Sequence, residues 1–71
     1  MAEEIRAEIV ANVLKVVAEV GDDLATGDTV VLLESMKMEI PVLTEGSGRL
    51  SRLAVGEGDV VQEGDLLAVL E

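Results

Sequence analysis

The sequence predicts an all-β fold in one small domain, and three observations support that prediction. Short apolar segments alternate with Gly- and Asp-rich clusters along the 71 residues, which is typical of a sandwich or barrel of short strands. Aromatic residues are absent, so the core must consist of aliphatic side chains, and the plentiful Val and Ile favour strands. One turn motif occurs twice and divides the chain into two similar halves. We therefore expect a single β domain over residues 1–71.

The apolar segments are expected to form the strands. In the first of them Ile5, Ala7 and Ile9 alternate with charged residues, so these three side chains are expected on one face. The expected strands are, in chain order, residues 4–10, 13–20, 29–34, 39–43, 49–55 and 66–71. The turn-forming residues between the later strands predict loops at residues 21–28, 44–48 and 56–65.

The duplicated motif lies in two of these loops. Residues 21–28 and 58–65 both follow the pattern Gly-Asp-x-aliphatic-x-x-Gly-Asp, at an offset of 37 residues (58 − 21). Each copy is followed by an apolar segment that ends in Leu-Glu. Gly permits the positive φ that a tight turn requires, and Asp can accept hydrogen bonds from nearby backbone amides. The repeat predicts two similar halves related by an approximate two-fold axis.

The repeat also predicts where the two ends of the chain lie. The strand at 29–34 continues through a Met-Lys-Met trio into residues 39–43, whereas the equivalent second strand ends at Glu71. Shifting residues 39–43 back by the offset gives a segment that begins at residue 2 (39 − 37). We therefore expect the chain ends to meet at the position equivalent to the turn at Lys37, at the opposite end of the molecule.

Composition and charge exclude several functions. The formal net charge of −10 argues against binding to nucleic acid or to anionic lipid. His and Cys are absent, which removes the usual zinc ligands, disulfides and the usual general base near neutral pH. The acidic loop at 21–28 lacks the ligand spacing of a calcium loop. No apolar run is long enough for a signal peptide or a membrane span. We expect a cytoplasmic protein without catalytic or metal-ligating residues.

Lys37 is the residue that this composition leaves unexplained. It is one of only two lysines and stands between Met36 and Met38, with apolar runs before Glu34 and after Glu39. Alternation alone places both methionines on one face, which favours a core role for them and leaves Lys37 ordinary. The second interpretation is an exposed strand reversal that presents the amine to another protein, because Met recurs on surfaces that must fit a partner.

A family resemblance supports the second interpretation. The segment ESMKMEIPV, residues 34–42, closely resembles the attachment signature of biotinyl domains, in which the lysine of the Met-Lys-Met trio is modified. The chain is similar over nearly its whole length to the biotinyl/lipoyl attachment family, and to its small stand-alone biotinylated carriers. The resemblance implies a flattened sandwich of two four-stranded antiparallel sheets with quasi-two-fold symmetry. It implies covalent biotin on Lys37, and recognition by a biotin protein ligase through the flanking residues Glu34, Ser35, Met36, Met38 and Glu39.

The same resemblance implies a carrier without catalysis of its own. A lysine is protonated at neutral pH and is a poor nucleophile unaided, so a ligase would have to present an activated biotinyl adenylate. The carrier would then move carboxyl groups between the biotin carboxylase and carboxyltransferase subunits or domains of a biotin-dependent carboxylase. In isolation we expect a monomer. The chain departs from many carboxylase carriers at residues 7–11, AEIVA, where those domains have a Pro- and Gly-rich stretch.

Two alternatives remain open at this stage. Lipoyl domains resemble this chain in fold but usually place Asp before the lysine and Ala after it, so Met36 and Met38 favour biotin over lipoate. The resemblance to small stand-alone members also leaves a dual biotin/lipoyl carrier open. The other alternative, from a different class, is an unmodified interaction module. It predicts that Lys37→Arg has no measurable effect, whereas the carrier hypothesis predicts complete loss of a streptavidin-reactive signal.

Overall fold

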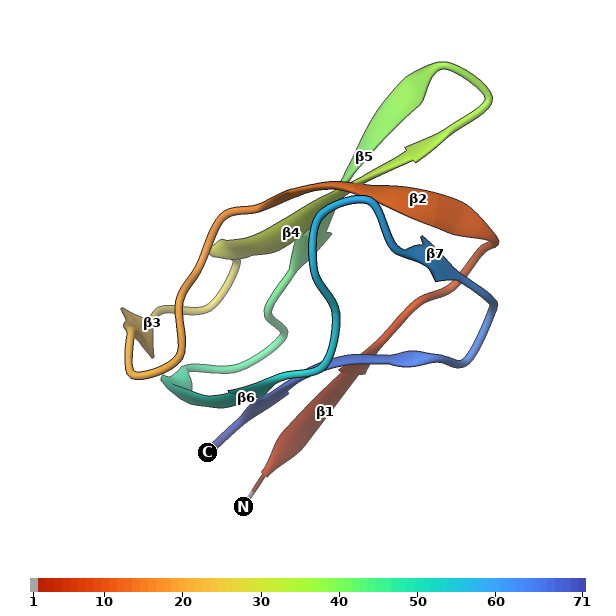
Figure 1. Cartoon of the computed structure of the whole chain (residues 1–71). Coiled ribbons are helices and arrows are strands. Elements are labelled where there is room, and N and C mark those ends of the chain that lie inside the picture. Colours follow the sequence, from red (N-terminus) through yellow and green to blue (C-terminus); the bar gives the residue numbers. More distant parts are fainter. Residues whose placement is uncertain (1) are drawn as a thin grey trace.

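The computed structural model describes residues 2–71, which form eight β-strands and no helix (Figure 1). The strands are β1 (Glu3–Arg6), β2 (Ala11–Val16), β3 (Asp23–Leu24), β4 (Thr29–Ser35), β5 (Met38–Leu43), β6 (Gly48–Leu53), β7 (Val60–Val61) and β8 (Leu66–Leu70). Over this part of the chain there is accordingly no helix that could cross a membrane.

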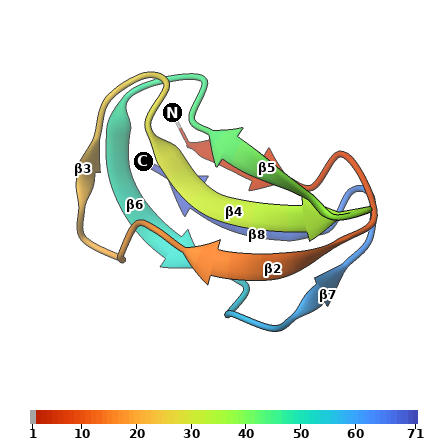
Figure 2. The same ribbon diagram turned by 90° about the horizontal axis from the view of Figure 1, so that it is seen from above.

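The strands form two four-stranded antiparallel sheets that lie face to face. Their strand orders are β1-β8-β6-β3 and β5-β4-β2-β7. Figure 2 shows β4 and β8 running one in front of the other, with both sheets curving around the interior. The molecule is elongated, with extents of 32 × 18 × 17 Å. The predicted fold class, a flattened all-β sandwich of two four-stranded sheets, is confirmed.

The register of the strands has the predicted internal symmetry. Leu33 pairs with Ile40 between β4 and β5, and a shift of 37 residues converts this pair into Leu70 with Glu3 between β8 and β1. The other three pairs of the β1–β8 ladder are related by the same shift to pairs of the β4–β5 ladder, including the bulge near Thr29. The ladders of β2 with β4 and of β6 with β8 are related in the same way. The two halves therefore share one backbone plan.

The structure explains why aspartate recurs at the same positions in both copies of the turn motif. The carboxylates of Asp22 and Asp59 accept hydrogen bonds from backbone N–H groups three residues earlier, at 2.9 and 2.8 Å. Asp28 and Asp65 do the same, each at 2.8 Å. Each aspartate thus closes its own turn, which is the local role that Asp side chains favour in turns. The acidic loops are structural features.

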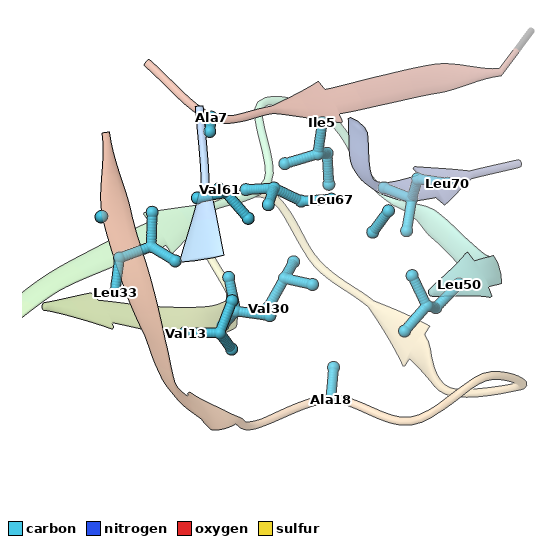
Figure 3. Packing of buried hydrophobic residues seen from close by; sticks show 13 residues of the cluster. Ile5, Ala7, Val13, Ala18, Val30, Leu33, Leu50, Val61, Leu67 and Leu70 are labelled. Atoms are coloured by element: carbon cyan, nitrogen blue, oxygen red, sulfur yellow. The ribbon is translucent and has the colours of Figure 1, made fainter. Parts of the chain in front are cut away.

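The core is aliphatic, as Figure 3 shows. Its buried residues are Ile5, Ala7, Ala11, Val13, Ala18, Val30, Val31, Leu33, Leu50, Val61, Leu67, Ala68 and Leu70. Residues related by the 37-residue shift occupy equivalent places, for example Val13 with Leu50 and Leu33 with Leu70. Because the chain is short and buries few side chains, each of these contributes a large part of the hydrophobic stabilisation.

Two groups of strand predictions need correction, and the first concerns where strands end: the strand expected at residues 13–20 is β2, which spans Ala11–Val16. The first strand was expected to reach residue 10 with Ile9 on its inner face, but β1 ends at Arg6 and Ile9 is 40% exposed. The reason lies in the backbone of Ala7, whose N–H donates to Asp65 O at 2.9 Å and whose C=O accepts from Gly64 N at 2.8 Å. These bonds hold the backbone of Ala7 against the second turn motif. The residues after Ala7 therefore do not continue β1, although their apolar and charged side chains still alternate in the sequence.

The second correction concerns the two loops that contain the motif. Residues 21–28 and 56–65 were expected to be loops throughout, but each contains a two-residue strand, β3 or β7. β3 pairs with β6, and β7 pairs with β2, so each short strand completes one of the four-stranded sheets. A two-residue strand is too short to produce a visible hydrophobic period, and only its pairing reveals it.

Candidate functional site

The candidate site is the hairpin formed by β4 and β5. The last pair of the ladder is Ser35 with Met38, which leaves Met36 and Lys37 as a two-residue loop. Figure 1 shows this hairpin projecting beyond the sandwich, at the end of the molecule opposite both chain termini. The predicted separation of Lys37 from the chain ends is confirmed, and so is its position at a strand reversal.

The backbone of the loop is in an unusual conformation. Met36 has φ of 53° and Lys37 has φ of 64°, and no other non-glycine residue within residues 2–71 has positive φ. Positive φ at both central residues is the type I′ arrangement, which matches the twist of a two-residue hairpin and normally selects Asn-Gly. For other L-residues this conformation costs about 1–2 kcal/mol each. The sequence did not predict it, because the usual residues for this turn are absent.

The side chains of the loop point into solvent. Lys37 is exposed, Met36 is 90% exposed and Met38 is 60% exposed. The prediction from alternation alone, that both methionines fill the core, is therefore wrong. Met36 lies in the turn rather than in a strand, and the inner face of β5 becomes half-buried only from Ile40 onward. Two exposed thioethers beside an exposed amine form a flexible apolar surface that costs solvation unless a partner covers it.

The remaining predicted site residues line the base of the loop. Glu34 and Glu39 face each other across the ladder and both are exposed, while Ser35 is half-buried. Like charges placed directly opposite on a hairpin are unfavourable by about 0.2–1 kcal/mol. The structure thus brings all six predicted residues, 34–39, to one projecting tip, and two features of that tip, the turn conformation and the carboxylate pair, do not favour folding.

The tip has no catalytic arrangement of its own. Within residues 2–71 the ion pairs join Arg6 to Glu4 and Arg49 to Asp23, and neither involves Lys37. A groove of about 390 Å³ lies between β1 and β5, but none of the tip residues lines it. Over the described chain no three acidic residues lie close enough together to hold a metal ion. What the tip offers chemically is an accessible primary amine with recognisable neighbours.

Comparison with known protein families decides which class of domain this is. A family model described as "Biotin-requiring enzyme", covering biotin and lipoyl domains, matches residues 3–70. The chain belongs to the biotin/lipoyl attachment family. This attachment domain is 60% identical over 70 residues to the "Biotinylated protein TB7.3 homolog" of Mycobacterium leprae, and the match covers 99% of each chain.

The attachment domain is also similar to parts of larger enzymes. It is 39% identical over 67 residues to the "Biotin-dependent acyl-coenzyme A carboxylase alpha3 subunit" of Mycobacterium leprae, covering 94% of this chain and 11% of that subunit. The crystal structure of Kluyveromyces lactis urea carboxylase contains a segment that superimposes with a TM-score of 0.94 at 38% identity. That match covers 100% of this chain and 6% of the enzyme. The fold and the family expected from the resemblance are both confirmed.

Proposed function

We propose that this attachment domain is a biotin carrier, modified on the side-chain amine of Lys37 by a biotin protein ligase. The observation that supports this most strongly is the position of Lys37, exposed at a projecting two-residue turn between two exposed methionines. A ligase active site can enclose such a turn without disturbing the sandwich. The biotinylated relative, which matches the chain over 99% of its length, supports the same assignment.

The residues of the tip fit an acylation driven from outside. In the reaction Lys37 Nζ loses a proton and bonds to the carbonyl carbon of biotinyl adenylate, while the bond from that carbon to AMP breaks. No base on the hairpin neighbours the amine apart from weakly basic carboxylates, so the ligase would receive the proton. The resulting amide removes one positive charge from the tip. Bound biotin would supply the ring nitrogen on which a carboxyl group is carried, and Lys37 would be the residue that holds it at the turn.

The neighbours of Lys37 have distinct recognition roles in this proposal. Met36 and Met38 supply apolar surface that a ligase can cover, with flexible side chains that adapt to its pocket. Glu34 and Glu39 place two carboxylates together, which favours a basic surface on the ligase. Ser35 precedes the turn and is half-buried, so its contribution is the closing pair of the hairpin.

The experiment compares the two lysines of the chain. Lys15, on β2, is exposed like Lys37 and supplies a matched control. The parent chain, Lys37→Arg and Lys15→Arg are incubated with purified biotin protein ligase, ATP and biotin, and intact mass is measured. We expect one biotin on the parent and on Lys15→Arg, and none on Lys37→Arg. One biotin on Lys37→Arg, or none on the parent, would contradict the proposal.

Lipoate is the second candidate, because the matched family covers both cofactors. Lipoate would be attached to the same exposed amine of Lys37, and the ligase that recognises the tip would decide which cofactor is attached. Parallel reactions with lipoate-protein ligase and lipoate test it on the same variants. We expect biotin transfer to be much faster, since the flanking methionines distinguish this tip from that of usual lipoyl domains. A lipoyl mass increment on protein from its native cells would replace biotin in the assignment.

A further inference from the structure

The internal symmetry of the sandwich reveals a surface that folding alone does not explain. Residues 37 positions apart occupy equivalent places in the strand ladders of the two halves, so these mates experience the same backbone environment. Away from the tip, the exposed large apolar residues are Ile9, Val10, Leu14, Val17, Val20, Leu43 and Val60. Their mates are, in the same order, Gly46, Ser47, Ser51, Ala54, Glu57, Arg6 and Asp23. None of the mates is a large apolar residue, so the fold tolerates small or polar side chains at these positions.

Several of these residues lie on one sheet face. On the outer face of the sheet β5-β4-β2-β7, Leu32 of β4 pairs with Pro41 of β5 on one side and with Lys15 of β2 on the other. Leu14 precedes Lys15 at the bulge of β2, and Val60 of β7 pairs with Asn12, two residues before Leu14. Leu43 follows two residues after Pro41. We call Leu14, Leu32, Pro41, Leu43 and Val60 the outer strip.

The equivalent face of the other sheet is built differently. The mates of the outer strip are Ser51, Val69, Glu4, Arg6 and Asp23. Arg6 pairs with Glu4 at 2.9 Å, and Asp23 pairs with Arg49 at 3.6 Å. One face is therefore covered by exposed ion pairs, while the same backbone on the other face carries aliphatic side chains. Single exposed apolar residues are ordinary, but their restriction to one of two equivalent faces points to an interaction.

Charge and position indicate what covers the strip. Glu34 and Glu39 lie on the same face, between the strip and the tip, because Glu34 is two residues from Leu32 along β4 and Glu39 is two residues from Pro41 along β5. A second copy would bring the same carboxylates and a net charge of −10, so self-association is opposed. The exposed Lys15 lies beside Leu32 on this face, so the complementary partner has an apolar centre with basic side chains toward Glu34 and Glu39 and an acceptor for Lys15. A partner that docks on the sheet would leave the turn uncovered, so the modified side chain of Lys37 could still move into an active site of that partner.

We propose that the outer strip is the docking surface for the biotin carboxylase component that loads the carboxyl group. This inference rests on the proposed biotin carrier function. The two partners would bind different surfaces: the ligase would bind the tip, and the biotin carboxylase component would bind the outer strip. The similarity to part of a biotin-dependent acyl-coenzyme A carboxylase subunit is consistent with such a partner.

The experiment exchanges residues with their symmetry mates. Leu14→Ser/Val60→Asp places on the outer strip the residues that the other face already carries, and Ser51→Leu/Asp23→Val is the reverse control. Each protein is first biotinylated with purified ligase. The acyl-CoA carboxylase's biotin carboxylase component, purified from the source organism, then carboxylates it with ATP and bicarbonate. We expect a KM about tenfold higher for Leu14→Ser/Val60→Asp with little change in kcat, because the exchange removes two apolar side chains from the docking surface. The control should keep the parent KM.

Each other outcome overturns part of the proposal. An unchanged KM, or a parent KM no lower than that of free biotin, would show that the strip does not dock this component. Ligation slowed as strongly as carboxylation would assign the strip to the ligase. A parent dimer in light scattering that the exchange dissociates would assign it to a second copy. Absence of biotin on the parent would instead refute the carrier function itself. Circular dichroism checks folding, and Leu14→Ser alone replaces the double variant if that one unfolds.

Discussion

The two ends of the sandwich share one strand pairing and differ in almost everything built on it. At one end β4 and β5 pair with Leu33 opposite Ile40, and at the other β8 and β1 pair with Leu70 opposite Glu3. Glu3 uses its carboxylate to accept hydrogen bonds from Glu45 N at 2.9 Å and Gly46 N at 3.0 Å. That end uses its polar groups to hold the fold together.

The Lys37 end does the reverse. Its carboxylates face each other, its turn has positive φ without Gly or Asn, and its methionines are exposed. The equivalent end, where the chain termini replace the turn, shows that this pairing does not require opposed carboxylates or exposed methionines, so these two features are explained by what the tip presents to a partner. Local conflicts with folding rules concentrate at functional sites, where other demands override them. The comparison thus identifies the tip without reference to any relative.

The largest effect tests the symmetry of the core. Val30 and Leu67 are mates and both are fully buried. Val30→Asp and Leu67→Asp each place an unpaired charge in a thin aliphatic core, so we expect both to unfold the domain at 25 °C. Thermal circular dichroism of each variant measures this. If one of them keeps a cooperative transition near that of the parent, the two halves do not contribute equally to one core.

A smaller effect tests the equivalence of the two turn motifs. Asp22 and Asp59 each accept one exposed backbone N–H, so Asp22→Ala and Asp59→Ala should destabilise the fold by about 1 kcal/mol each. Urea unfolding of the two variants gives the free energies, and neither change should alter biotinylation of Lys37. Values that differ several-fold would mean that one turn has a role beyond closing its loop.

Much of the fold was predictable because the repeat is explicit in the sequence. The offset of 37 residues placed the chain ends beside each other and Lys37 at the far end, and the strand registers agree with it. The errors arose where alternation was extended past a backbone constraint, as at Ile9, or past a turn, as at Met36 and Met38. The alternation of apolar and polar residues predicts that a strand is present, but it does not predict the residue at which the strand ends.

The gathering of residues 34–39 at one tip was predictable from the sequence, but the conformation of that tip was not. The motif of residues 34–39 identified the tip, and the structure brings those residues together there. The positive φ of the turn could not be predicted, because neither Met nor Lys indicates it. The outer strip was missed as well, since exposed and buried aliphatic residues look alike in a sequence. Only the comparison of each residue with its mate in space separates them.

The smallest expected effect tests whether the turn was selected for folding or for recognition. Met36→Asn introduces the residue that type I′ turns prefer at their first central position, and Lys37 keeps its place. We expect a stabilisation below about 1 kcal/mol, visible as a rise in Tm of a few degrees for a domain of this size. Met36→Leu is the matched control, because it keeps apolar surface without favouring positive φ. If the thioether is read by the ligase, initial rates of biotinylation should fall for both variants although only Met36→Asn gains stability. Parent-like rates in both would show that Met36 does not contribute to recognition, and a loss of stability in Met36→Asn would show that the turn geometry is not what its φ values indicate.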